Sequence, residues 1–259
     1  MYEKVKQYEK PIIADDDFLI IAGPCSVENE AGLEKIARFL LDNGVSFMRA
    51  GAFKPRTNPY SFQGLGLKGL EILKKVKQKT GIKIVSEITE EKLIPYYVEN
   101  IDIIQVGARN MQNFPLLRAL GKVNVPILLK RGFGATIEEW LYACEYLLEG
   151  GNQKVILCER GIKTFENMTR NTLDISSVPV IKNITKIPVI IDPSHSSGRS
   201  DIVRPLSRAA TAVGAKGLMI EVHDEPDLSL SDSDETINFA EFTKLLEEVR
   251  DIRRVMLGK

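Results

Sequence analysis

The segment PVIIDPSH, at residues 188–195, shows the pattern from which the architecture of this chain can be inferred. Its first half is a short apolar run, and its second half is polar and includes two ionisable side chains, Asp192 and His195. The apolar residues are continuous rather than alternating, which is typical of a strand buried on both faces in a parallel sheet. The segment is therefore interpreted as a buried strand that ends in a group of chemically active residues.

Runs of the same kind occur on both sides of this segment along the whole chain. They are FLIIAGPCS (18–26), FMRAGAFK (47–54), KIVSEI (83–88), IIQVGAR (103–109), PILLKRG (126–132), KVILCERG (154–161) and GLMIEVH (217–223). They begin at intervals of about 28 residues on average, close to the length of one strand–helix unit. Eight such units predict an α/β protein with a single (β/α)8 barrel, the TIM-barrel architecture.

An open, doubly wound sheet is the alternative architecture. That fold would place a glycine-rich phosphate turn of the form GxGxxG after its first strand. The first run here ends in GPCS instead, which favours the barrel.

Amphipathic segments between the apolar runs predict the helices. Residues 31–44 and 66–81 each carry one apolar stripe and end at a glycine. Thr136, followed by Glu139, indicates a capping box at the start of a helix. Residues 236–257 are expected to form the closing helix.

Composition excludes several classes of protein. The 259 residues include 35 basic and 35 acidic side chains, so a general basic surface for nucleic acid is not expected. No apolar run approaches the ~18 residues of a membrane-spanning helix, and the charged N-terminus does not resemble a secretory signal. The three cysteines show no paired spacing, which predicts a cytoplasmic protein.

Residues 1–259 are expected to form one catalytic domain, with 1–17 as a short N-terminal extension and no regulatory domain.

Basic side chains gather where the predicted strands end. In barrels of this kind, the chemistry occurs at the carboxyl ends of the strands. The residues concerned are Arg49, Lys54, Arg56, Arg109, Lys130 and Arg160, with Thr57 beside Arg56, and the third strand ends in the acidic Glu87. Buried cations require acidic neighbours or an anionic ligand, and arginine with lysine suits phosphate and carboxylate groups. Arg131 and Glu159 should face the other way and pair at the surface.

A second group comes from the first, seventh and eighth strands, which adjoin when a barrel closes. Cys25, His195 and Glu221 would bring a thiolate, an imidazole and a carboxylate to one point, in the outline of a divalent metal site. Asp232 is available as a fourth ligand. Simpler interpretations apply elsewhere: Cys144 and Cys158 as core residues, His223 as structural, and residues 164–171 as a solvated loop.

Seven motifs in order carry a resemblance to a known family. They are AGPCSVE (22–28), RAGAFKPRT (49–57), YSFQGLG (60–66), QVGARN (105–110), LLKRG (128–132), DPSHSSG (192–198) and IEVH (220–223). Together they resemble 3-deoxy-D-arabino-heptulosonate 7-phosphate (DAHP) synthase, in the short microbial form related to 3-deoxy-D-manno-octulosonate 8-phosphate synthase. The resemblance implies the condensation of phosphoenolpyruvate with erythrose 4-phosphate, the first step of the shikimate pathway.

The resemblance also implies roles for individual residues. It assigns Cys25, His195, Glu221 and Asp232 to one divalent metal ion, for which the mixed ligands would accept Mn, Fe, Co or Zn. It assigns Arg49, Lys54, Arg109, Lys130 and Arg160 to phosphoenolpyruvate, and Arg56 with Thr57 to the phosphate of erythrose 4-phosphate. Lys54 is expected to transfer a proton, and Glu87 to orient water. Asn58 departs from the usual serine, so phosphate binding is expected to be retained but altered.

Two other interpretations compete with this one. The octulosonate synthase branch carries an Asn-Arg pair where this chain has Pro55-Arg56-Thr57. A barrel without activity that only binds a partner would be expected to have lost some of the charged residues. Here all four predicted metal positions and all six basic positions are filled.

The family is usually tetrameric or dimeric, so a homo-oligomer is expected. With no segment left for a second folded unit, we expect no inhibition by aromatic end products.

Overall fold

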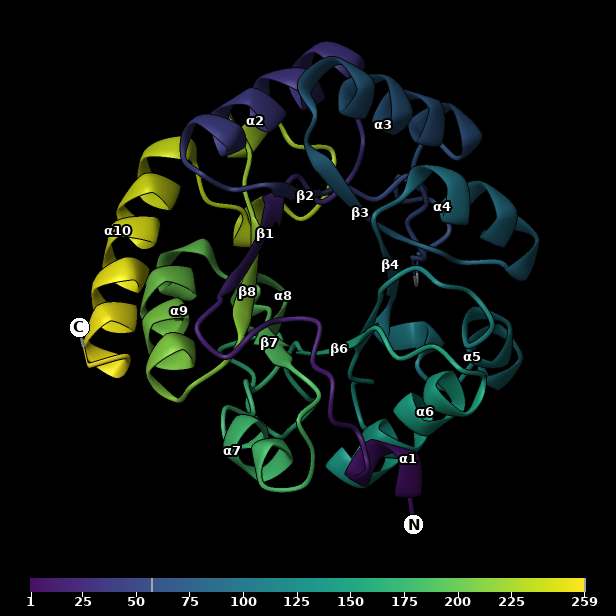
Figure 1. The fold of residues 1–259 in the computed structure, drawn as a ribbon. Coiled ribbons are helices and arrows are strands. Elements are labelled where there is room, and N and C mark those ends of the chain that lie inside the picture. The colour runs from purple at the N-terminus through teal and green to yellow at the C-terminus, as the bar shows by residue number, and fades with distance from the viewer. Residues whose placement is uncertain (57, 259) are drawn as a thin grey trace.

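The computed structural model describes residues 1–56 and 58–258, and within them eight parallel strands close into a barrel in chain order (Figure 1). The strands are β1 (Leu19–Gly23), β2 (Phe47–Arg49), β3 (Lys83–Glu87), β4 (Ile103–Val106), β5 (Ile127–Lys130), β6 (Val155–Glu159), β7 (Val189–Ile191) and β8 (Gly217–Glu221). The predicted (β/α)8 barrel is confirmed. Thr57 lies outside the described residues.

Helices surround the barrel, as Figure 1 shows. They are α1 (Glu3–Lys6), α2 (Glu30–Asp42), α3 (Leu67–Thr80), α4 (Ile94–Asn100), α5 (Phe114–Leu120), α6 (Ile137–Glu149), α7 (Ser177–Lys182), α8 (Pro193–Ser197), α9 (Val203–Ala212) and α10 (Phe239–Met256). Short 3-10 turns are η1 (Glu91–Leu93), η2 (Ala108–Asn110), η3 (Ser200–Ile202), η4 (Pro226–Leu228) and η5 (Ser233–Glu235).

Side-chain caps determine where two of these helices begin. The predicted capping box opens α6: the Thr136 side chain accepts from the backbone N–H of Glu139 at 3.1 Å, and the Glu139 carboxylate accepts from the backbone N–H of Thr136 at 2.7 Å. A second capping box opens α10, where the Asn238 side chain accepts from the backbone N–H of Glu241. This helix therefore starts at Phe239 rather than at residue 236, because Asn238 satisfies its first free N–H groups.

Barrel closure brings β7, β8 and β1 together. In β1 and β8, Gly23 is paired with Glu221, and Ile191 of β7 is paired with Leu218 of β8. Gly23 has a φ of 141°, and a Cβ atom there would lie 2.4 Å from the carbonyl oxygen of Arg49. Only glycine permits this close approach of β1 to β2, two residues before Cys25.

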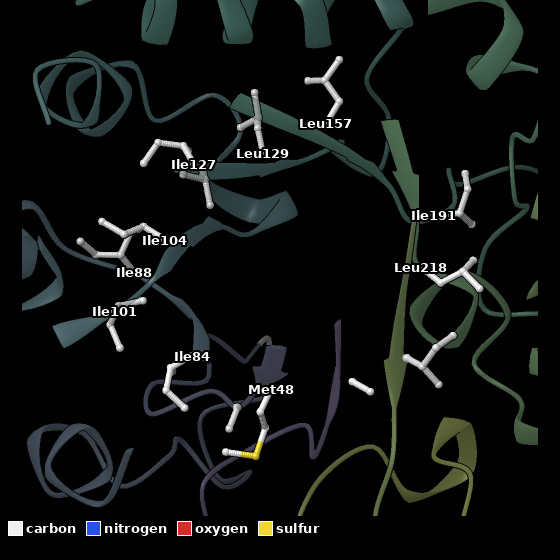
Figure 2. Packing of buried hydrophobic residues seen from close by; sticks show 14 of the residues in the cluster. Met48, Ile84, Ile88, Ile101, Ile104, Ile127, Leu129, Leu157, Ile191 and Leu218 are labelled. Carbon is white, nitrogen blue, oxygen red and sulfur yellow. The ribbon is translucent and has the colours of Figure 1, made fainter. Parts of the chain in front are cut away.

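The core has two layers on opposite faces of the barrel. Buried side chains inside the barrel are Ile21, Val85, Ile103, Leu128, Ile156, Cys158, Ile190 and Met219. Alternate residues point outward and pack against the helices, among them Met48, Ile84, Ile104, Ile127, Leu129, Leu157, Ile191 and Leu218 (Figure 2). Both faces are thus apolar, which explains the continuous apolar runs. Cys144 and Cys158 are buried in the core, as predicted.

The N-terminal extension is part of this packing. Backbone N–H groups of Lys4 and Val5 donate to the Glu145 carboxylate of α6, both at 2.9 Å. The chain then crosses one end of the barrel (Figure 1), where Ile13 joins the interior cluster. None of the described helices has the length and apolar character needed to cross a membrane.

Candidate active site

A pocket of about 220 Å³ lies at the carboxyl ends of the strands. Its lining contains most of the charged residues expected there, namely Arg49, Lys54, Arg56, Glu87, Arg109, Lys130, Arg160, His195 and Asp232, together with Arg170, Gln105 and Phe133, which were not expected. The residues come from loops and strand ends all around the barrel. The pocket is therefore polar and rich in cations, as an anionic ligand requires.

Four potential metal ligands converge beside this pocket. Cys25, His195, Glu221 and Asp232 each offer one ligand atom, and these atoms all lie within 4.8 Å of one another. Cys25 follows β1, Glu221 ends β8, His195 lies in α8 after β7, and Asp232 comes from the loop after β8. The structure thus brings together the three residues expected from barrel closure, with Asp232 as the available fourth.

The donor set suits a divalent cation. The Cys25 thiol donates to Oδ2 of Asp232 at 2.7 Å, and Nζ of Lys54 lies 2.6 Å from Sγ. Oε2 of Glu221 is buried and has no hydrogen-bond partner among the described residues, a costly state that a cation would relieve. Burial raises the pKa of Cys25 to about 12, so a thiolate there requires a strong nearby positive charge, as a metal provides.

Asp192 orients the His195 imidazole, a role that the sequence analysis missed. Its Oδ2 lies 2.7 Å from Nδ1 of His195 and accepts from Nζ of Lys130 at 2.5 Å, while its Oδ1 accepts from the backbone N–H of His195 at 2.9 Å. This leaves Nε2 of His195 facing Glu221, at 3.2 Å from Oε1. Burial lowers the pKa of His195 to about 4, so the ring is neutral and able to bind a metal.

The pocket cations differ in how they are compensated. Arg49 pairs with Glu221, and Arg56 lies 3.2 Å from Oδ1 of Asp232. Arg160 is 4% exposed, and its Nη1 atom is buried with no hydrogen-bond partner among the described residues. Its guanidinium lies over the Phe133 ring at 4.6 Å from the centroid. A buried, incompletely bonded guanidinium at the end of a barrel strand is a favourable site for an anionic group.

Glu87 projects into the same pocket. Its Oε2 accepts from Nε2 of Gln105 at 3.2 Å. A Cβ atom at Gly107 would lie 2.0 Å from Oε1 of Glu87, so a larger residue there would displace the carboxylate from this position. The position is compatible with the predicted contact to water.

The expected surface pair of Arg131 and Glu159 is instead buried. Nη1 of Arg131 lies 3.0 Å from Oε2 of Glu159 and 2.7 Å from Oδ2 of Asp174, and both members of the expected pair are inaccessible or nearly so. The prediction of pairing was right, but the prediction of surface exposure was wrong. The face of a barrel strand that points away from the axis is covered by helices and loops rather than by water.

The loop at residues 164–171 is only partly the solvated segment that was expected. Phe165 and Met168 are exposed, but Arg170 reaches the pocket and Asn171 is buried. Nδ2 of Asn171 donates to the backbone carbonyl of His195 at 3.0 Å. His223 has a structural contact, because its Nδ1 accepts from the backbone N–H of Glu225 at 3.0 Å.

Comparison with known proteins gives matches over nearly the whole chain. The model of the DAHP synthetase I family matches residues 4–257. Phospho-2-dehydro-3-deoxyheptonate aldolase of Thermotoga maritima is 54% identical over 240 residues, which cover 93% of this chain and 71% of the relative. A 2-dehydro-3-deoxyphosphooctonate aldolase of Geobacter sulfurreducens is 32% identical, with coverage of 93% and 94%.

Solved structures agree with this assignment. The crystal structure of the Thermotoga maritima phospho-2-dehydro-3-deoxyheptonate aldolase (DAHP synthase) superposes with a TM-score of 0.91 at 53% identity, covering 95% of this chain and 72% of that one. A truncated form of 3-deoxy-D-arabino-heptulosonate 7-phosphate synthase from Thermotoga maritima gives a TM-score of 0.87 at 50% identity, covering 95% and 90%. Sequence and fold therefore show that the chain belongs to the DAHP synthetase I family.

Proposed function

We propose that the pocket is the site at which this chain performs its family's reaction, with a divalent metal ion bound by Cys25, His195, Glu221 and Asp232. The reaction is the condensation of phosphoenolpyruvate with erythrose 4-phosphate and water to DAHP and phosphate. The observation that carries the proposal is the cluster of four ligand atoms within 4.8 Å, directly beside a cation-lined pocket.

The charges of the pocket match those of the substrates. Near neutral pH the two substrates bring roughly five negative charges, since each phosphate carries about −1.5 to −2. Six cations of the predicted set line the pocket: Arg49, Lys54, Arg56, Arg109, Lys130 and Arg160. A divalent metal adds to them, so the site can bind both substrates together.

The residues divide between the two substrates. Arg160, Lys130 and Arg109 would hold phosphoenolpyruvate, and Arg56 the phosphate of erythrose 4-phosphate, with Thr57 as a further ligand by resemblance. The metal, when bound, would supply Lewis-acid polarisation of the aldehyde oxygen.

In the reaction, C3 of phosphoenolpyruvate attacks the aldehyde carbon of erythrose 4-phosphate. Water then adds at C2 of the former phosphoenolpyruvate, and cleavage of its C–O bond to the phosphate group releases phosphate. Holding the two reactants in contact is the main contribution of these cations.

Lys54 is the proposed proton donor to the new alkoxide. Burial lowers its pKa, but the opposing effect of Cys25, together with Glu221 and Asp232, is larger and leaves the pKa raised. Lys54 is therefore protonated at neutral pH, and its Nζ lies 3.7 Å from Oδ2 of Asp232, beside the predicted aldose site. We assign the orientation of the attacking water to Glu87, which faces the same pocket.

A direct assay tests this function. The protein is incubated with phosphoenolpyruvate and either erythrose 4-phosphate or arabinose 5-phosphate, and loss of the enol is followed by ultraviolet absorbance. We expect turnover with erythrose 4-phosphate, loss of activity on chelation, and recovery with a divalent cation. Preference for arabinose 5-phosphate would instead favour the reaction named for the octulosonate relatives. Full activity after exhaustive chelation would overturn the metal proposal.

Ligand variants separate metal binding from folding. Cys25→Ala and His195→Ala should each abolish binding of Mn²⁺ or Zn²⁺ in calorimetry while leaving the circular dichroism spectrum unchanged, because both lie at the catalytic end of the barrel. Cys144→Ala, at a buried cysteine of α6, is the matched control and should bind metal normally. Equal metal binding by all three variants would contradict the assignment.

We further propose that residues 1–259 act as one catalytic unit and assemble as a tetramer or dimer. The support is that the described elements form one barrel and that the family is usually oligomeric. Light scattering of the purified protein would measure the assembly, and a monomer at assay concentration would refute it. A cytoplasmic location stays a prediction from the cysteine pattern.

A further inference from the structure

Arg170 is a charged residue of the pocket that the reaction scheme leaves without a role. It lies in the loop after β6, and its side chain is 39% exposed. Its Nη1 donates to Oε1 of Glu235 at 2.8 Å and lies 2.6 Å from Oε2. The same nitrogen lies 3.8 Å from Oδ1 of Asp232. The guanidinium is thus bound on one side and accessible to the pocket on the other.

Backbone contacts hold this loop against the helix that carries His195. The backbone N–H of Arg170 donates to the carbonyl of Ser197 at 2.9 Å, and that of Asn171 donates to the carbonyl of Ser196 at 3.0 Å. Gly198 ends α8 with a φ of 65°, and a Cβ atom there would lie 2.6 Å from Cβ of Arg170. Arg170 is therefore held in position by the same short helix that positions His195.

Glu235 is the carboxylate that holds the Arg170 guanidinium. It lies in η5, and its side chain is fully inaccessible to solvent. Burial and the neighbouring Glu221 raise the pKa of Glu235, and Arg170 is the cation that opposes this shift. A buried ion pair contributes little net stability, because desolvation offsets the attraction. Its clearer physical consequence is orientation, since two carboxylate oxygens constrain one face of the guanidinium.

Arg170 and Arg56 approach the same carboxylate oxygen. Nη1 of Arg56 lies 3.2 Å from Oδ1 of Asp232, and Nη1 of Arg170 lies 3.8 Å from it. Lys130, by contrast, is bound to Asp192 on the other side of His195. The two arginines therefore belong to the Asp232 side of the pocket, where the proposed function places the aldose phosphate.

We propose that Arg170 and Arg56 together bind the phosphate group of the aldose substrate, and that Glu235 positions Arg170 for this contact. The inference rests on the proposed function, because that function supplies the aldose phosphate. A phosphate with a charge near −2 has enough acceptor oxygens for two guanidinium groups. Glu235 acts through Arg170 and does not itself contact substrate.

The first experiment compares Michaelis constants for both substrates in Arg170→Met and in a matched control. Arg204→Met is the control, because Arg204 also pairs with a glutamate, Glu248, and is 36% exposed, but lies on α9 outside the pocket. We expect Arg170→Met to raise the KM for erythrose 4-phosphate about tenfold, the lower end for a charge-assisted contact because the side chain is partly exposed. The KM for phosphoenolpyruvate should change less than about twofold. Arg204→Met should change neither constant.

Further variants keep the test valid if the single variant folds poorly. Arg170→Met leaves Glu235 buried without its cation, so the double variant Arg170→Met/Glu235→Gln removes both charges and carries the same expectation. Glu235→Gln alone should raise the KM for erythrose 4-phosphate less than Arg170→Met does. Added guanidinium chloride at millimolar concentration should partly restore the Arg170→Met enzyme, which a merely structural role would not allow.

Unphosphorylated erythrose provides the deciding comparison. If Arg170 binds the phosphate, Arg170→Met should lower kcat/KM for erythrose 4-phosphate about tenfold and leave that for erythrose unchanged. Equal losses for the two sugars, or an unchanged KM for erythrose 4-phosphate, would overturn the role of Arg170 while wild-type turnover leaves the proposed function intact. Absence of wild-type turnover with erythrose 4-phosphate would overturn both.

Discussion

Replacement of Asp192 by asparagine tests how the His195 ligand is held. The carboxylate is fully buried and accepts from three donors: Nζ of Lys130 and Nδ1 of His195 at Oδ2, and the backbone N–H of His195 at Oδ1. Asparagine has one carbonyl oxygen and one NH2 group of nearly the same shape. Whichever way the amide is turned, its NH2 group must face at least one of these donors.

The magnitude follows from these contacts. Burial raises the pKa of Asp192, but His195 and Lys130 outweigh this effect and hold it well below its ordinary value, so the wild-type carboxylate is ionised. Each charge-assisted hydrogen bond contributes about 1.5–3 kcal/mol. Removing one member of a buried ion pair costs about 3–5 kcal/mol in total, because the remaining charge, here Lys130, is left uncompensated. We expect Asp192→Asn to lose about that much unfolding free energy and to bind metal roughly 10- to 100-fold more weakly.

Urea unfolding of the metal-free protein and calorimetric titration with Mn²⁺ or Zn²⁺ measure the two effects. Asp201→Asn is the matched control, because Asp201 pairs with Arg199 at an exposed position and its loss should cost less than about 1 kcal/mol. If Asp192→Asn matched this control in both stability and metal affinity, the reasoning about His195 orientation would be refuted.

Three further predictions concern other parts of the molecule. Arg56→Ala should raise the KM for erythrose 4-phosphate roughly 10- to 150-fold and change the KM for phosphoenolpyruvate little. Arg109→Ala should instead raise mainly the KM for phosphoenolpyruvate. If both variants affected the same substrate, the division of the pocket between the two substrates would be wrong. Burial raises the pKa of Tyr8 to about 12, above its unfolded value of about 10, so its contribution to stability is complete below pH 10 and is lost as the pH rises towards 12. Tyr8→Phe should therefore weaken the pH dependence of urea unfolding between about pH 10 and 12. Gly107→Ala should lower kcat at least about tenfold, because its methyl group would lie 2.0 Å from Oε1 of Glu87, and unchanged turnover would exclude a role for that carboxylate.

The barrel could be inferred from local pattern alone. Each apolar run is continuous because both faces of its strand are buried, and this is visible without knowing what the strand packs against. The capping box at Thr136 is equally local, since its two hydrogen bonds join residues three apart. Closure of the barrel then made Cys25 and Glu221 neighbours, because the first and eighth strands must pair.

The members of the site were largely foreseeable, but their partners were not. Strand ends indicate which residues reach the catalytic end, because all parallel strands terminate there. Strand ends do not indicate where each side chain points or which partner it contacts. The position of Asp192 at a strand end therefore does not reveal that it holds His195. Arg131 and Glu159 show the same limit: alternation predicted their face correctly, but not that other elements cover it.

The contact between Arg170 and Glu235 is the clearest example of a feature that the sequence does not predict and the tertiary structure determines. Both lie in irregular segments after strands, where no periodicity constrains the side chain, and they are separated by 65 positions along the chain. Their contact depends on the loop after β6 being held to α8 by backbone hydrogen bonds that any residue except proline could donate. Periodicity and burial specify the barrel from the sequence, whereas the contacts among the loops arise only when the closed barrel brings its strand ends together.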